Sequence, residues 1–367
     1  MIFLESTDNM KLEKQYSTIL TIFIPLLLCF ATMFFVTNGA VFAQDYRLPV
    51  ITPVLEGQVK VRSYSWVDEL RHRVVPFLMY YPAETDSSCP VVFFSHGLGG
   101  SSRDSAYLGK VWAQAGIVSI HLQHIGSDET LNKGVRLRTY FDMRDAYSQH
   151  WSGRDRARDI KFVLDYLTEL SRNNPQIGDV LDLDRVGVSG FNLGALASLL
   201  LAGQSPPDGR VSLKDERFKA VIALGTPLNS YNQSYRTVYE KITIPCLFIN
   251  GSEDNSIIGS TTAQQRRIPF DALTANDHYL VTLAGAGHSS YTYTPLPFTT
   301  PDSSYYNVIA KLTVSFWQAQ LGIDEQAKNA WQDKNWRPQI GRAGTFERRL
   351  KPVVILEPEP TVDEPTM

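Results

Sequence analysis

The residues Asp184 to Gly203 read DRVGVSGFNLGALASLLLAG and decide which fold this chain can form. The run from Arg185 to Gly190 has the apolar composition of a buried β-strand. A turn bounded by Gly190 and Gly194 follows it, and the alanine- and leucine-rich residues after the turn predict a buried helix. The stretch therefore predicts a strand, a tight turn and a helix in immediate succession.

The turn, Gly190-Phe191-Asn192-Leu193-Gly194, has the spacing of the Gly-x-Ser-x-Gly turn that holds a nucleophilic serine in strained geometry above a sheet. Asn192 stands where that pattern has serine. A carboxamide has no hydroxyl proton to give up and is a poor nucleophile. The sequence therefore predicts the geometry of a catalytic turn without its attacking group.

The composition indicates a globular chain and excludes some partners. Of 367 residues, 43% are hydrophobic and 20% are charged, which is enough apolar material for one large domain with a sizeable core. The formal net charge is -3, so there is no basic excess to attract a phosphate backbone. We expect no nucleic-acid partner, and the oligomeric state leaves no signal in the sequence.

Residues 1–43 are predicted to be a targeting segment. Lys11 and Lys14 precede the apolar run from Ile19 to Val36, and Val41-Phe42-Ala43 offers small residues where a signal peptidase reads. Cleavage is expected before Gln44.

An uncleaved membrane anchor stays open, because the apolar run is about as long as the roughly 18 residues that span a bilayer. The start of translation also has two candidates, Met1 and Met10, since Glu5 and Asp8 suit a signal peptide poorly. Whether or not the segment is cleaved, we expect an exported protein, periplasmic or extracellular, and an uncleaved segment would be its only contact with a membrane.

Residues 44–350 are predicted to be one α/β domain in which strands and helices alternate. An antiparallel hairpin is expected at the sheet edge, and short continuous apolar runs after it predict buried strands of a mostly parallel central sheet flanked by helices on both faces. The expected strands are 58–66, 73–81, 90–94, 117–120, 185–190, 220–224, 246–250 and 279–283, and the expected helical segments include 106–115, 131–171 and 305–320.

Residues 351–367 are rich in proline and acidic side chains and are predicted to be a disordered tail. Cys89 and Cys246 each adjoin an apolar run, so we expect two buried thiols rather than a disulfide framework. No cysteine and histidine spacing predicts a zinc site, and no metal or cofactor is expected.

Three strand ends carry polar residues that the fold would bring together. The loops beyond the carboxyl ends of parallel strands share one crevice, so Asn192, Asp254 and His288 are expected to meet there. Asp254 would hold one tautomer of His288, and the backbone N–H groups of Leu98 and Leu193 would form an oxyanion hole.

These motifs resemble the α/β-hydrolase superfamily and, within it, the predicted dienelactone hydrolase and platelet-activating-factor acetylhydrolase group. The residues that carry the resemblance are VVFFSHGLGG, VGVSGFNLGALASL, IPCLFINGSEDNS and AGAGHSSY. The resemblance implies an α/β-hydrolase fold and roles as acid and histidine for Asp254 and His288. The catalytic serine of the resembled family has no counterpart in this chain, because Asn192 stands at its position.

The sequence alone keeps three functional hypotheses open. The first is a degenerate hydrolase that binds a small ester or lipid and hydrolyses it slowly or not at all. The second is an active hydrolase that uses an aspartate formed from Asn192, or water activated by His288 and Asp254. The third is a non-catalytic ligand-binding or interaction protein on the same scaffold. A sequence error at Asn192 is a further alternative.

Other polar residues near the motifs are expected to be structural. Ser189 lies inside the expected strand 185–190, and Ser95 lies before the turn that contains Leu98. Neither therefore occupies the exposed apex that a nucleophile needs. His121 and His124 lie at another strand end without a partner that the sequence identifies.

Overall fold

The computed structural model describes residues 46–351 apart from 56, 133–135, 151–152, 175–178, 207–208, 229–232 and 294–299. The described residues from Arg47 onward belong to one compact unit. The predicted targeting segment and the predicted tail beyond Lys351 lie outside the described residues. Within the described part of the chain, no helix has the length and apolar character needed to cross a bilayer.

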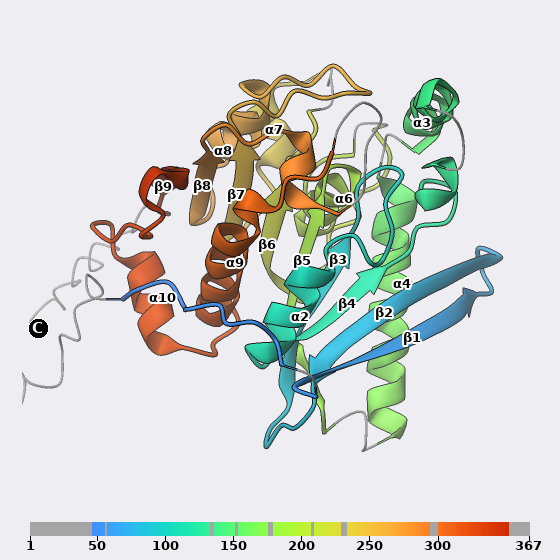
Figure 1. Cartoon of the computed structure of the whole chain (residues 1–367). Coiled ribbons are helices and arrows are strands. Elements are labelled where there is room, and N and C mark those ends of the chain that lie inside the picture. Colours follow the sequence, from blue (N-terminus) through green and yellow to red (C-terminus); the bar gives the residue numbers. More distant parts are fainter. Residues whose placement is uncertain are drawn as a thin grey trace, which may run out of the picture. The chain divides into compact units, whose positions relative to one another are not determined.

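The centre of the fold is a single nine-stranded sheet with the strand order β1-β2-β4-β3-β5-β6-β7-β8-β9 (Figure 1). Strands β3 to β8 pair in parallel, and the pairs at the two ends of the sheet are antiparallel. This is the α/β-hydrolase fold that the sequence predicts. The strands are β1 Val59–Asp68, β2 Arg73–Pro82, β3 Cys89–Ser95, β4 Val118–Leu122, β5 Leu181–Phe191, β6 Phe218–Leu224, β7 Cys246–Gly251, β8 His278–Leu283 and β9 Gly344–Arg349.

Burial follows the position of each strand in the sheet. All residues of β3, β4 and β7 are buried, because helices cover both faces of the inner strands. Strand β1 is mostly exposed, alternates between exposed and half-buried positions only from Ser63 to Val67, and pairs with β2 as an antiparallel edge hairpin, as predicted.

Helices pack on both faces of the sheet, as expected (Figure 1). On one face α6 packs against β5, β6 and α4, and on the other α2 and α9 meet through an edge-on contact between Trp112 and Trp317. The α-helices are α2 Ala106–Gln114, α3 Arg136–His150, α4 Arg154–Asn173, α6 Leu193–Ala202, α7 Tyr235–Tyr239, α8 Ile268–Ala272, α9 Tyr306–Gln320 and α10 Glu325–Gln332.

The structure differs from the prediction in two places. The helical segment expected from Leu131 to Ser171 is divided into α3 and α4, and α4 begins after Gly153, whose φ of 67° is not helical. Strand β9 and helix α10 were not predicted. Four of the six residues of GTFERR are polar or charged, so the sequence lacks the apolar pattern of a strand. Charged side chains are common on edge strands, where they discourage pairing with another strand.

The elbow glycines are required by close backbone contacts. A Cβ atom on Gly194 would lie 1.9 Å from the carbonyl oxygen of Ser95, and one on Gly190 would lie 2.3 Å from the carbonyl carbon of Gly194. Helix α6 therefore starts in direct contact with the end of β3. This contact brings the apex at Asn192 next to the turn that follows β3.

Gly194→Ala is expected to destabilise the fold by about 3 kcal/mol or more, because the clashing atoms belong to the backbone and have nowhere to move. Urea unfolding measures this loss. Ala195→Gly, one position further into α6, is the matched control and should cost about 0.5–1 kcal/mol. Equal midpoints for Gly194→Ala and the wild type would contradict the tight elbow.

Candidate active site

Asn192 forms the apex between β5 and α6. Its φ of 53° and ψ of -118° are unusual, and among the described non-glycine residues only His72 shares a positive φ. Such a backbone conformation costs on the order of 1–3 kcal/mol and persists only where the surroundings impose it. The Asn192 side chain is therefore held above the sheet in the geometry of a nucleophile elbow.

The structure brings Asn192, His288 and Asp254 into one hydrogen-bonded chain. Asn192 Nδ2 lies 2.9 Å from His288 Nε2, and His288 Nδ1 lies 2.6 Å from Asp254 Oδ1. Because the amide nitrogen can only donate and the carboxylate can only accept, His288 is neutral and carries its proton on Nδ1. Asn192 is 7% exposed, Asp254 is fully buried, and the side chain of His288 is 8% exposed.

The other half of the Asn192 amide contacts the backbone. Its Oδ1 accepts a hydrogen bond of 2.8 Å from Leu193 N, one of the two N–H groups expected to form an oxyanion hole. The Leu98 N–H, the other expected donor, has no acceptor among the described residues. Thus one of these two donors is already occupied by the protein itself.

Arg266 lies behind the acid and is completely buried. Its Nη2 lies 2.9 Å from Asp254 Oδ1, its Nε donates to the Asp254 carbonyl, and its Nη1 donates to the carbonyls of Gly225 and Thr226. Nη2 also lies 3.2 Å from His288 Nδ1, but both atoms are donors in the neutral ring, so the ion pair with Asp254 is the stabilising contact.

Asp254 is a carboxylate in this setting. Burial alone would raise its pKa, but the neighbouring His288 and Arg266, together with hydrogen bonds from His288 and Tyr291, outweigh burial and lower the pKa below its usual value. The Tyr291 hydroxyl donates to Asp254 Oδ2 at 3.0 Å. Both carboxylate oxygens are therefore satisfied, which fixes the plane of the acid against His288.

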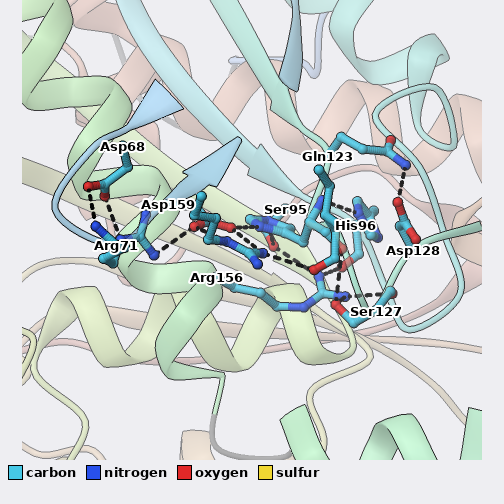
Figure 2. Close-up of polar contacts among 12 residues, drawn as sticks. Asp68, Arg71, Ser95, His96, Gln123, Ser127, Asp128, Arg156 and Asp159 are labelled. Atoms are coloured by element: carbon cyan, nitrogen blue, oxygen red, sulfur yellow. Dashed lines mark hydrogen bonds and ion pairs between the residues drawn. The ribbon is translucent and has the colours of Figure 1, made fainter. Parts of the chain in front are cut away.

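A second buried network holds the turn that follows β3 (Figure 2). The Arg156 guanidinium donates to the carbonyls of His96 and Gly97 and to both oxygens of Ser127. Burial lowers the pKa of Arg156 to about 9, which leaves it charged at neutral pH. Because C=O and N–H of a trans peptide point in opposite directions, these bonds direct the Gly97 and Leu98 N–H groups away from Arg156.

His124 does have partners, contrary to the sequence-based expectation. Its Nε2 lies 2.9 Å from Ser95 Oγ and its Nδ1 2.9 Å from Asp159 Oδ2, while Asp159 also binds Arg71 and Arg73. Ser95, His124 and Asp159 thus have the connectivity of a serine triad. All three are fully buried, so a substrate has no access to Ser95, and the network is structural.

His121 and Ser189 are structural as well. His121 Nε2 bonds to Ser119 Oγ at 2.8 Å, and burial lowers the pKa of His121 to about 3. Ser189 Oγ donates to the Phe93 carbonyl inside the sheet. Neither side chain reaches Asn192. Cys89 and Cys246 are free and buried.

A small cavity adjoins Asn192 and His288. It has a volume of about 20 Å³, room for about one water molecule. Apolar side chains of the turn after β3, of α3 and of the loop after β7 cover it, and its lining residues are Leu98, Met143, Tyr147, Phe191, Asn192, Ser256, Ile257, Ile258 and His288. A larger cavity of about 280 Å³ lies between the β1–β2 hairpin and α4 and includes none of the three site residues.

The fold and this arrangement of side chains define a protein of the α/β-hydrolase type. Residues 121–265 match a protein family described as serine hydrolase (FSH1). The matched region contains Asn192 and Asp254 and ends before His288. No curated protein matches the chain. The family match supports a hydrolase-like function.

The structure brings together the three side chains that the sequence singles out, but the residues that support them were not predicted. Tyr291 follows His288 closely in the motif AGAGHSSY and could have been suspected from that spacing. Arg266 lies in the polar run QQRR, which reads as exposed surface, and nothing in the sequence signals its burial. Arg156 and Asp159 lie three residues apart on α4, where charged residues ordinarily indicate a solvated face.

Arg266→Met is expected to destabilise the protein by about 3–5 kcal/mol at neutral pH, because it leaves the Asp254 charge buried with less compensation. The pKa of Asp254 is lowered in the folded state, so its contribution to stability is complete above the unfolded pKa and is lost as pH falls through the folded one. The deficit of the variant should therefore shrink in acid.

The neighbouring Arg267→Met is the matched control for this measurement. Arg267 forms half-exposed ion pairs with Asp271 and Glu347, which contribute about 1 kcal/mol or less. Urea unfolding of both variants from neutral to acidic pH separates the two cases. A similar, pH-independent loss for both would show that Arg266 does not support the acid.

Proposed function

We propose that this chain is an exported protein of carboxylic-ester hydrolase descent that keeps a site for a small ester or lipid and lacks efficient acyl-enzyme hydrolysis. One observation carries the proposal: the Asn192 amide occupies both the base that a catalytic serine would use and the N–H group that would bind the oxyanion of the substrate. Its nitrogen binds the base, His288 Nε2, and its oxygen binds the oxyanion-hole donor, Leu193 N. No group on Asn192 can attack an acyl carbon.

The expected loss of activity is large. Removing the nucleophile of a well-studied serine protease lowers turnover roughly a millionfold, while oxyanion hole and binding preserve roughly a thousandfold or more over water. In this site the activity that an oxyanion hole would preserve is lowered as well, because Leu193 N already donates a hydrogen bond to Asn192 Oδ1. The proposal therefore places the ordinary esterase activity of the amide form near the background rate.

The cavity lining supports an apolar ligand. Leu98, Met143, Ile257 and Ile258 surround the space beside Asn192, and the charges of Arg266 and Asp254 are buried beneath it. Because the cavity holds about one water, an acyl group must displace the Met143 and Tyr147 side chains or the loop residues opposite them. A small acyl group fits this lining best, and the chemistry proposed needs no metal or cofactor.

A second candidate is an active hydrolase with an aspartate nucleophile formed from Asn192. The observation that favours it is the contact of 2.8 Å between Leu193 N and the Asn192 side-chain oxygen, which places the nitrogen that drives deamidation beside the amide. Direct activation of water by His288 has less support, because Nε2 already accepts a hydrogen bond from Asn192 Nδ2.

Asn192→Ser is expected to raise the hydrolysis of short p-nitrophenyl esters at least about a hundredfold over the wild type, a small part of the cost of nucleophile removal. A serine at this apex would donate to His288 and release Leu193 N for the oxyanion. Turnover of freshly purified mature protein and variant measures the effect.

Two matched variants control this experiment. Asn192→Ala should gain nothing, and His288→Ala in the Asn192→Ser background should remove the gain. Brisk wild-type turnover that a serine-directed phosphonate blocks would contradict the proposal, since it would require a nucleophilic serine elsewhere in the chain.

A further inference from the structure

We infer that Asn192 is a self-processing site: the Leu193 nitrogen closes on the Asn192 side chain to form a cyclic imide, and water then opens the imide to an aspartate. The inference rests on the proposed hydrolase-type site, because His288 and Asp254 serve the chemistry. It assigns them a substrate within the chain itself. Four features of the elbow support it.

The backbone at Asn192 already has the shape of the ring. A cyclic imide joins Leu193 N to Asn192 Cγ in a five-membered ring, which requires the nitrogen to eclipse Cβ about the Cα–C bond. At an L-residue a ψ of -118° produces this eclipsed arrangement, and together with a φ of 53° it is the conformation of the first central residue of a type II′ turn. The strain that ring closure ordinarily requires is thus present before reaction.

The attacking nitrogen is next to its target. Leu193 N lies 2.8 Å from Asn192 Oδ1, and as the first N–H of α6 it has no carbonyl acceptor within the helix. Ring closure therefore breaks no helical hydrogen bond. Holding reacting groups in such a geometry accelerates intramolecular reactions, with effective concentrations on the order of 10⁵–10⁸ M in the best aligned cases.

The leaving group faces a proton donor and acceptor. Asn192 Nδ2 lies 2.9 Å from His288 Nε2, and Asp254 stabilises the imidazolium form of that ring. In a serine triad the histidine protonates the departing amine, and His288 is placed to do the same for Nδ2. The residues that have lost an acyl-transfer nucleophile thus remain positioned for amide cleavage.

The two steps balance as follows. In ring closure the Leu193 N–Cγ bond forms and Leu193 N gives its proton to water; the neutral His288 takes up a proton from water at Nε2 and passes it to Nδ2, the Cγ–Nδ2 bond breaks and ammonia leaves. In ring opening water adds to Cγ and gives a proton to His288 Nε2, the Leu193 N–Cγ bond breaks, and His288 returns the proton to that nitrogen through water. The product is an aspartate at position 192 with the main chain intact.

The elbow also favours the normal aspartate over the isomerised one. Opening at Cγ needs a water beside the side chain, and the cavity there has room for about one. Opening at the backbone carbonyl of residue 192 would move the main chain into the side-chain branch and disrupt the start of α6. We expect the product to retain the helix and to place its carboxylate beside His288.

Asn250 provides an internal control. Gly251 follows it, and in an unfolded chain a following glycine hinders attack on the amide least. In the folded protein Asn250 lies in β7, where an extended ψ of about +115° turns the next nitrogen away from the side chain. Its Nδ2 is also held by the Arg266 carbonyl. The fold should therefore protect Asn250 and activate Asn192.

Peptide mapping by mass spectrometry of the purified full chain, incubated at neutral pH either folded or in urea, tests this. In the folded sample the peptide with Asn192 should lose ammonia or carry the mass of aspartate at least about tenfold more often than the peptide with Asn250. This ratio is a small part of the rate increase that orientation of reacting groups can give. In urea the order should reverse. Unmodified Asn192 in a folded sample whose urea counterpart is converted at Asn250 would overturn the inference.

His288→Gln tests the role of the histidine. Glutamine keeps an acceptor for Asn192 Nδ2 but cannot carry the proton, so conversion at residue 192 should fall at least about tenfold while Asn250 in urea is unaffected. Unchanged conversion in this variant, with its fold confirmed by circular dichroism, would overturn the part assigned to His288. These results are independent of the ester assays, since Asn192→Ser can gain activity whether or not the amide is processed.

Discussion

The site depends on one constraint: the Asn192 amide is fixed at both ends on a strained apex. Its nitrogen binds His288 and its oxygen binds Leu193 N, while the backbone has a φ of 53°. Gly190 and Gly194 allow this apex because any side chain there would overlap the main chain. The strand β5, the helix α6 and the turn after β3 are thereby fixed against each other, and the three-residue site follows from that packing.

In our proposals, the two contacts that keep the Asn192 amide from acyl transfer also arrange it for ring closure. In a serine hydrolase the base, the oxyanion donor and the strained apex act on a bound substrate. With Asn192 in place of serine, each of them acts on the side chain itself. The proposed loss of acyl transfer and the proposed processing of the amide therefore follow from the same residue, and the buried Arg266 and Arg156 networks hold the geometry that both proposals require.

Much of the fold and the core of the site were predictable from the sequence, for identifiable physical reasons. The buried strands β3 and β7 are continuous apolar runs, and Gly190 and Gly194 frame the elbow, so the positions of Asn192, Asp254 and His288 follow from the topology. The supporting charges were not predictable, since a buried arginine differs from an exposed one only in its surroundings. The hydrogen bond from Leu193 N to the side-chain oxygen of Asn192 was not predictable from the sequence either.

Nuclear magnetic resonance of freshly purified, ¹⁵N-labelled protein tests the central claim most directly. The account predicts a neutral His288 with its proton on Nδ1 and a coupling between His288 Nε2 and the Asn192 side-chain amide across their hydrogen bond. It also predicts slow exchange of that amide with solvent. A proton on Nε2 of the neutral ring, or an Asn192 amide that exchanges as an exposed one does, would contradict it.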